Sequence, residues 1–223
     1  MQTFTADQAA ELAVVTRGGF TESRHVGSVV VLDSAGQVAF SAGAPDELIY
    51  ARSALKPLQT IASMNAGAEL QGAQIALASG SHTGSFEHMK VAQTVLAEAG
   101  LTADDVQCPA AWPADEPSYH ALVQAGHGKQ KLAYNCSGKH AAFLWGCVKS
   151  GWDTATYLEP QHPLQQLVLQ TIEDYTGETP QHVSVDGCGA ALAATSLTGL
   201  AHAYSTLGAA AYNIKADARV ATV

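Results

Sequence analysis

Short apolar runs separated by glycine-containing turns mark the first third of the chain. One run begins at Leu12 and ends at the glycine pair Gly18 and Gly19. Two more apolar runs lie on either side of residues 33–36 (DSAG), whose residue types are typical of a turn between two hairpin strands. This pattern predicts a β-rich beginning of the chain.

Apolar positions recur at helical spacing after Ser53. The segments 86–100 and 163–177 each carry an apolar stripe along one helix face, and each ends at a glycine. The stripes consist of Phe86, Met89, Ala92, Leu96 and Ala99 in the first segment and of Leu164, Leu167, Val168 and Ile172 in the second. Residues 182–187 (HVSVDG) predict a further strand that runs into a glycine turn.

The composition is that of a folded globular protein. Hydrophobic residues make up 47% of the 223 positions and charged residues only 14%. No apolar run approaches the ~18–20 residues of a membrane-spanning helix, and the N-terminus lacks a basic region followed by an apolar stretch. We therefore expect a cytoplasmic protein without a membrane span or a signal peptide.

The net charge of the chain is −9, from 11 basic and 20 acidic residues. A charge of this sign repels nucleic acids and anionic membranes, and no basic stripe offsets it. We therefore expect neither nucleic acid nor membrane among the partners of this protein.

The segment ARSALKP places Ser53 and Lys56 three residues apart, so that the two side chains share a face on a helix. A serine hydroxyl becomes a good nucleophile when a base takes its proton, and a lysine is such a base when burial lowers its pKa. Ser-x-x-Lys has this role in β-lactamases and penicillin-binding proteins. The alternative is structural: Pro57 suits a first helical turn, so that Ser53 would open a helix and Lys56 would be solvated.

Small and polar residues crowd the segment ASGSHTGSFEH at 78–88. Ser81 and His82 are adjacent, so their side chains do not face each other on a regular element. A direct nucleophile–base pair between these two residues is therefore not expected. The alternative is a turn followed by a helix N-cap at Ser85.

The segment NCSGKH at 135–140 concentrates reactive side chains, and the four cysteines of the chain are too few for a disulfide scaffold. Cys136 and Lys139 could form a zinc site with Cys188. Zinc, however, usually takes four ligands, and a lysine ligand must first lose its proton. A nucleophilic Cys136 paired with His140 and a set of buried, inert thiols remain open as alternatives.

Residues 186–194 (DGCGAALAA) superficially match a dinucleotide-binding fingerprint. The third glycine position of that fingerprint is Leu192, and no βαβ unit with a later acidic residue is evident. We therefore set a dinucleotide site aside.

Taken together and in this order, the segments ARSALKPLQ, SGSHTG, NCSGKHAAFL and VDGCGA resemble the L-asparaginase II family of the thermolabile, rhizobial type. The resemblance extends from RGG near Arg17 to about Leu207 and includes QCPAAWP, EPQHPLQ and LTGLA. It implies an α/β (α+β) fold in which a mostly antiparallel sheet packs with helices, similar to serine β-lactamases and glutaminases. It also implies that residues 1–223 belong to a single domain.

The resemblance implies a set of site residues and a reaction. The implied catalytic residues are Ser53, Lys56 and Ser81, the implied substrate-binding residues are Arg52, His82 and Asp186, and the implied zinc ligands are Cys136, Lys139 and Cys188. The reaction would be hydrolysis of L-asparagine to L-aspartate and ammonia through a lysine-activated serine acyl-enzyme, with both serines at the reacting carbon. Zinc would tune affinity or structure without supplying the nucleophile, no organic cofactor is implied, and the protein would be a homodimer.

Two other functions fit the same residues. A glutaminase-like amidohydrolase of the same fold would differ in pocket length, and a non-catalytic metal-binding or interaction protein would carry an incomplete site. Chains of the resembled family continue past the position of Val223 and supply a second lysine, a role that no matched residue has here, Lys215 included. We therefore expect a C-terminally incomplete domain with little asparaginase activity of its own and with unpaired sheet edges.

Overall fold

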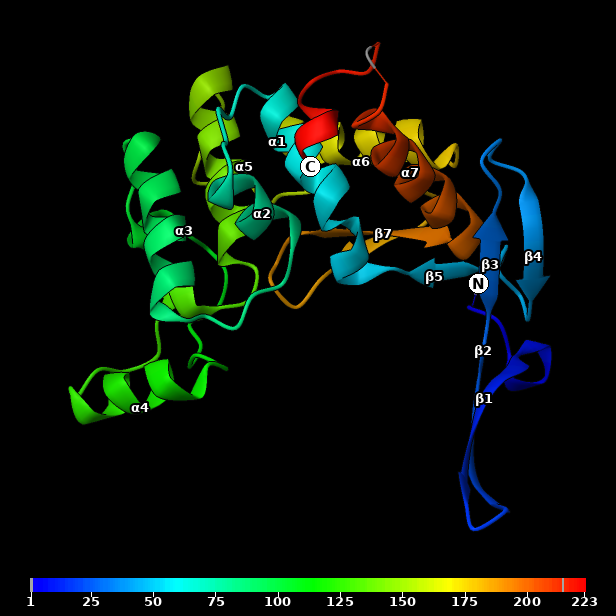
Figure 1. The fold of residues 1–223 in the computed structure, drawn as a ribbon. Coiled ribbons are helices and arrows are strands. Elements are labelled where there is room, and N and C mark those ends of the chain that lie inside the picture. The colour runs from blue at the N-terminus through cyan, green and yellow to red at the C-terminus, as the bar shows by residue number, and fades with distance from the viewer. Residues whose placement is uncertain (1, 214) are drawn as a thin grey trace.

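The computed structural model describes residues 2–213 and 215–223, in which helices form a body with short strands at one side (Figure 1). The α-helices are α1 (Lys56–Asn65), α2 (Ala73–Ser79), α3 (Phe86–Glu98), α4 (Glu116–Gln124), α5 (Ser137–Ser150), α6 (Pro163–Thr176) and α7 (Leu197–Ala210). The strands are β1 (Ala10–Arg17), β2 (Phe20–Gly27), β3 (Val29–Leu32), β4 (Val38–Ala42), β5 (Leu48–Tyr50), β6 (Val183–Val185) and β7 (Ala191–Ser196). The predicted mixed α/β class is confirmed.

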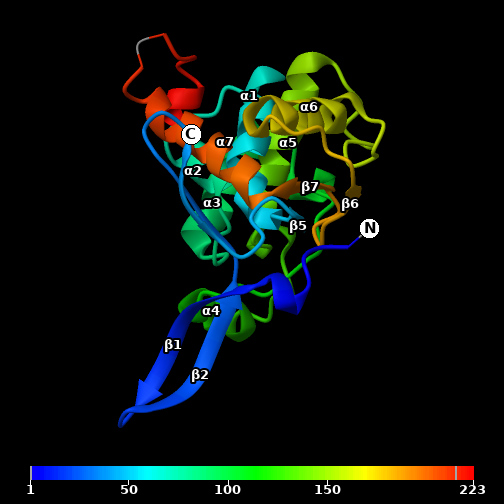
Figure 2. The same ribbon diagram turned by 90° about the vertical axis from the view of Figure 1, so that its right-hand side faces the viewer.

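The described strands pair in three small antiparallel sheets: β1 with β2, β3 with β4, and β5-β7-β6. Gly18 and Gly19 turn the first hairpin, and both have positive φ angles, which glycine adopts without a steric penalty. The predicted turn at 33–36 joins β3 to β4, where the Asp33 carboxylate accepts the N–H groups of Ala35 and Gln37. Figures 1 and 2 show the β1–β2 hairpin extending away from the helical body.

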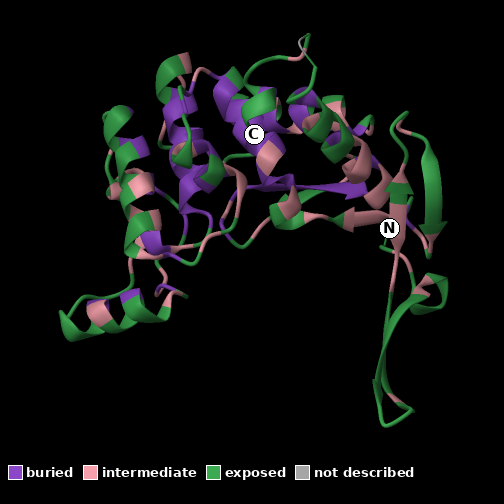
Figure 3. Ribbon diagram, in the orientation of Figure 1, coloured by how far each residue is buried: buried purple, intermediate pink, exposed green. Residues whose placement is uncertain are grey.

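Helices α1 and α5 pack against each other in the core of the protein, and both are largely buried, as is β7 (Figure 3). Helix α5 is buried continuously from Ser137 to Cys147, so no face of its first three turns is left to solvent. A Cβ atom at Gly146 would lie 3.0 Å from the Cβ of Ala66, just past the end of α1. Small residues therefore allow α1 and α5 to approach closely. Among the described helices, none has both the length and the apolar character that a membrane crossing requires.

The caps predicted for α3 and α6 are present in the structure, whereas the start of α1 differs from the sequence-based alternative. Ser85 caps α3 by accepting the N–H of His88, and Gly177 ends α6 with a φ of 72°. The structural alternative for Ser53, that it opens a helix, is wrong: Ser53 lies in a 3-10 turn, Arg52–Leu55, and the α-helix begins only at Lys56. Arg52, the first residue of this turn, has a φ angle of 51° in the left-handed region, and no described side chain caps the turn.

Candidate active site

Lys56 occupies the centre of the candidate site. It is the first residue of α1 and only 1% exposed. Its Nζ donates to the Ser81 hydroxyl at 3.0 Å, to the Gly80 carbonyl at 3.1 Å and to the Asn135 carbonyl at 3.0 Å. One lysine thus joins three of the sequence segments that carried the family resemblance, and it satisfies all three ammonium protons.

Burial is the main cause that lowers the pKa of Lys56, and the thiol of Cys136 opposes it. A neutral amine can still donate to the two carbonyl oxygens, while its lone pair accepts a proton from the third partner. Of its three partners, only Ser81 has a proton to give. The arrangement therefore suits Lys56 to act as a base toward Ser81.

Ser53 lies beside this arrangement without joining it. Its 3-10 turn places it three residues before Lys56, a separation at which side chains in such a turn eclipse each other. Ser53 is exposed, and its carbonyl accepts the backbone N–H of Lys56. Among residues 2–213 and 215–223, no hydrogen bond is found between the Ser53 hydroxyl and Lys56 Nζ. The structure thus pairs the predicted lysine with the second predicted serine.

Arg52 and Asp186 connect two distant parts of the site. The Arg52 guanidinium donates to the Asp186 carboxylate at 2.7 Å, and the same oxygen accepts the N–H of Gly187 at 2.8 Å. Arg52 is the one described non-glycine residue with a positive φ, and backbone strain of this kind concentrates at functional sites. Both residues were predicted to contact substrate, and the ion pair sets their relative position.

His82 uses both of its ring nitrogens inside the protein. The Ser137 hydroxyl donates to the carbonyl of Leu132 at 2.8 Å, so His82 Nε2–H must donate to Ser137, 3.0 Å away. His82 Nδ1 then accepts the N–H of Gly84 at 3.1 Å. Burial, followed by the charges of neighbouring groups, lowers the pKa of His82 to about 4, so the ring is neutral at pH 7. This places His82 as a residue that positions the Ser81 loop.

The predicted zinc ligands Cys136, Lys139 and Cys188 come together in the interior, each at most 5% exposed. Lys139 Nζ donates to the Cys188 sulfur at 3.2 Å. A hydrogen bond between the two thiols lowers the pKa of Cys188 and raises that of Cys136. Cys188 is therefore the more acidic thiol of the pair, and the Lys139 amine lies beside it.

His140 extends this cluster to Tyr157, a residue that the sequence did not indicate. The Tyr157 hydroxyl accepts the N–H of Gln107 at 3.0 Å and shares a second hydrogen bond, of 2.7 Å, with His140 Nδ1. His140 Nε2 is buried, and the ring interacts with the Cys188 sulfur. Tyr157 stands in no recognisable motif, so only the fold could reveal it.

The donor set of this cluster fits a soft divalent metal in part. Two sulfurs and one amine converge there. The described residues contain no group of three or more His, Cys, Asp and Glu side chains suited to a metal, so the Lys139 amine would have to complete the set. That lysine would have to bind as a neutral amine.

A cavity of about 440 Å³ opens next to Ser81. Gly80, Thr83, Glu87 and His88 also line it. Glu87 and His88 were not singled out in the sequence, because their place at the start of α3 is typical of helix capping. The candidate nucleophile therefore borders a space that can admit a small molecule.

The protein-family model described as L-asparaginase II matches residues 13–223 of this chain. A search of curated proteins returned no match. The family match includes every residue of the candidate site described above.

Proposed function

The chain belongs to the L-asparaginase II family, and we propose that it hydrolyses the side-chain amide of L-asparagine to give L-aspartate and ammonia. The contact that carries this proposal is the hydrogen bond of 3.0 Å between Lys56 Nζ and the Ser81 hydroxyl. A buried lysine in contact with a serine hydroxyl is an arrangement that can activate the serine for acyl transfer from an amide.

We assign the role of general base to Lys56. In its neutral form it takes the proton of Ser81, whose oxygen attacks the amide carbon and forms a bond to it. The carbon–nitrogen bond then breaks, and the lysine ammonium returns the proton to the departing nitrogen, which leaves as ammonia. A water molecule next attacks the ester, releases aspartate and restores the Ser81 hydroxyl.

Ser53 is assigned as the second hydroxyl at the reacting carbon, on the exposed turn just before Lys56. Backbone N–H groups of Ser53 and Ser81 would stabilise the oxyanion, a contribution worth ~3–4 kcal/mol in other enzymes. Arg52 and Asp186 are assigned to substrate binding, since their ion pair presents one positive and one negative group. The α-carboxylate of an amino-acid substrate would contact Arg52, and its α-ammonium group would contact Asp186.

A zinc ion held by Cys136, Lys139 and Cys188 is part of the proposal. Such an ion would supply positive charge behind Lys56, which interacts with Cys136 and Cys188. The protein residues make the covalent bond in this proposal, and zinc binding would serve structure and substrate affinity.

The test is ammonia release from L-asparagine, with L-glutamine as the competing amide substrate. We expect Ser81→Ala to abolish release, and Ser205→Ala, an exposed serine on α7, to leave it unchanged. Mass spectrometry of acid-quenched enzyme would locate the acyl group on a Ser81 peptide. Full activity of Ser81→Ala would refute the proposed chemistry, and an acyl group on Ser53 would exchange the roles of the two serines.

A further inference from the structure

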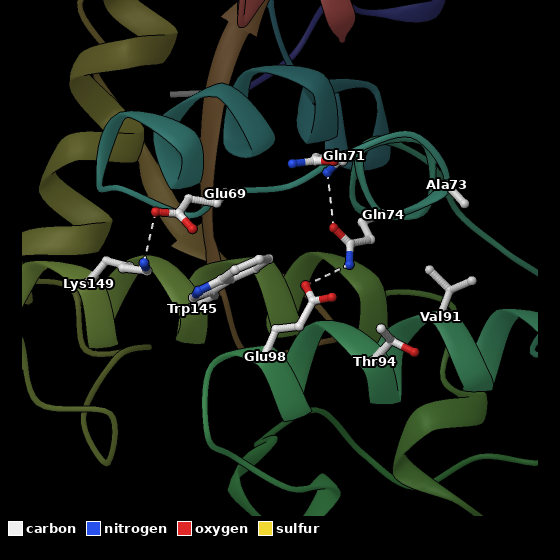
Figure 4. Close-up of a pocket in the computed structure, with 9 residues that line it drawn as sticks. All are labelled: Glu69, Gln71, Ala73, Gln74, Val91, Thr94, Glu98, Trp145 and Lys149. Atoms are coloured by element: carbon white, nitrogen blue, oxygen red, sulfur yellow. Dashed lines mark hydrogen bonds and ion pairs between the residues drawn. The ribbon is translucent and has the colours of Figure 1, made fainter.

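A second cavity, of about 610 Å³, lies between the loop after α1, the start of α2, helix α3 and helix α5 (Figure 4). It contains none of the proposed catalytic residues. Ala73 and Val91 border both this cavity and the one at Ser81, so the two are neighbours. Its chemistry is different and consists of one aromatic ring between charged groups.

Trp145 forms the floor of this second cavity. The residue is 4% exposed, and its indole N–H is buried without a hydrogen-bond acceptor among the residues that the structure describes. A buried donor without a partner costs free energy, so an acceptor that reaches the indole N–H would stabilise the protein. Figure 4 shows the nitrogen of the ring on the side of Lys149.

The two ends of the cavity carry opposite charges. At one end Lys149 Nζ contacts Glu69 at 2.9 Å, and their side chains are 40% and 68% exposed. An ion pair this exposed contributes little stability and opens readily. At the other end Glu98 accepts from Gln74 through Oε2 at 2.8 Å, which leaves its other oxygen for a ligand cation.

We propose that this cavity binds a free α-amino acid in its zwitterionic form. The ligand carboxylate replaces Glu69 at Lys149 and accepts the indole N–H of Trp145, while the ligand ammonium donates to Glu98. Each polar group of the ligand then has a partner of opposite charge, and the orphaned donor is satisfied. The proposal does not depend on the hydrolytic chemistry at Ser81.

Binding at this place would brace α3 against α5. Both helices begin at the candidate active site, α3 just after the Ser81 loop and α5 just after Cys136, and both reach the second cavity near their C-terminal ends. A ligand held between Glu98 and Lys149 therefore links the far ends of the helices whose first turns support the proposed chemistry.

Intrinsic fluorescence tests this proposal, because the chain has only three tryptophans. In the double variant Trp112→Phe/Trp152→Phe the emission comes from Trp145 alone. We expect glycine, which has both charged groups and no side-chain amide, to change this emission saturably. We expect it also to raise the melting temperature of the unmodified chain. The second measurement does not rely on the tryptophan variant.

Variants at the two ends of the cavity identify the binding mode. Lys149→Met and Glu98→Gln should each weaken glycine binding by about tenfold or more, because each removes a charge-assisted hydrogen bond. Lys90→Met, an exposed lysine of α3 outside the cavity, is the matched control and should bind like the parent. Acetate and methylammonium, which each carry half of the zwitterion, should bind far more weakly than glycine.

Three results would overturn the proposal. They are the absence of a saturable response to glycine in both measurements, unchanged binding in Lys149→Met, and acetate binding as tight as that of glycine. The last would show a simple anion site. Loss of ammonia release in Ser81→Ala has no bearing on these measurements, so the two proposals fail separately.

Discussion

The His82 imidazole donates to the Ser137 hydroxyl over 3.0 Å and so ties the loop that carries Ser81 to the first residue of α5. The second ring nitrogen holds the N–H of Gly84 within the same loop. A ring committed on both sides fixes the loop backbone, and with it the position of the Ser81 oxygen relative to Lys56.

We expect His82→Ala to lower the free energy of unfolding by ~1–3 kcal/mol, because it leaves the Gly84 N–H without its acceptor and removes the hydrogen bond to the Ser137 hydroxyl. Urea unfolding at pH 7 measures this difference. His120→Ala is the control, since the His120 side chain is 60% exposed and pairs only with exposed Glu116; its effect should stay within ~0.5 kcal/mol.

The contribution of His82 should depend on pH with a defined sign. Its pKa is about 4 in the folded protein and 6.5 in the unfolded chain. The unfolded state therefore binds the proton more strongly, and the stabilisation is complete above pH 6.5 and is lost as the pH falls toward 4. The stability gap between the parent and His82→Ala should narrow over that range. A gap that stays constant would contradict the assigned tautomer and charge.

The activity of Lys56 as a base gives a second prediction. Lys56→Arg retains the positive charge, but arginine does not release its proton, so we expect kcat/KM for L-asparagine to fall by about 10²–10⁴-fold. Lys90→Arg on the surface of α3 should have no effect.

The pH profile of the parent enzyme checks the same role. Burial lowers the pKa of Lys56, so activity should rise with pH through a value below the ~10.4 of a free lysine. The pKa of Lys56 is lower in the folded protein than in the unfolded chain, so the unfolded chain binds the proton more strongly. Loss of this proton as the pH rises therefore increases the free energy of unfolding. An activity that is independent of pH across the neutral and alkaline range would exclude Lys56 as the base.

The zinc proposal predicts metal content that depends on two cysteines. Purified protein should contain zinc by elemental mass spectrometry, and the double variant Cys136→Ala/Cys188→Ala should contain none. Cys147→Ala is the matched control, because Cys147 is also a buried thiol but interacts with Asp153 instead of the cluster. Zinc that persists in the double variant would place the metal elsewhere.

Much of the local structure could be predicted from the sequence, because its signals are local. The cap at Ser85, the glycine after α6 and the turn at 33–36 each depend on neighbouring residues, and each is present in the structure. The family of the chain was also recognisable, since four ordered segments identified it together.

The contacts that define the site could not be predicted, because they join distant segments. Strand β7 reads ALAATS, with neither alternation nor many β-branched residues, and it is a strand because β5 and β6 pair with it on both sides. Lys56 contacts Ser81 and not the Ser53 hydroxyl because the fold brings residues 80, 81 and 135 around its amine. The spacing of Ser53 and Lys56 in the sequence gives no information about the segments that contain Ser81 and Asn135.

The glycine of the NCSGKH segment gives the last prediction. A Cβ atom at Gly138 would lie 2.6 Å from the carbonyl oxygen of Leu77 in α2, a distance that no side chain tolerates without movement of the backbone. We expect Gly138→Ala to lower the free energy of unfolding by ~1–3 kcal/mol or more, since overpacking in a rigid contact displaces the helix.

Gly208→Ala on the exposed face of α7 is the matched control, because a Cβ there meets no atom within 4 Å. Alanine should be neutral at that position or stabilise the protein by ~0.5–1 kcal/mol through its helix propensity. The displacement at Gly138 should also move Cys136 and Lys139 away from Cys188. Gly138→Ala protein that is as stable as the parent would show that α2 and α5 are not held in this contact.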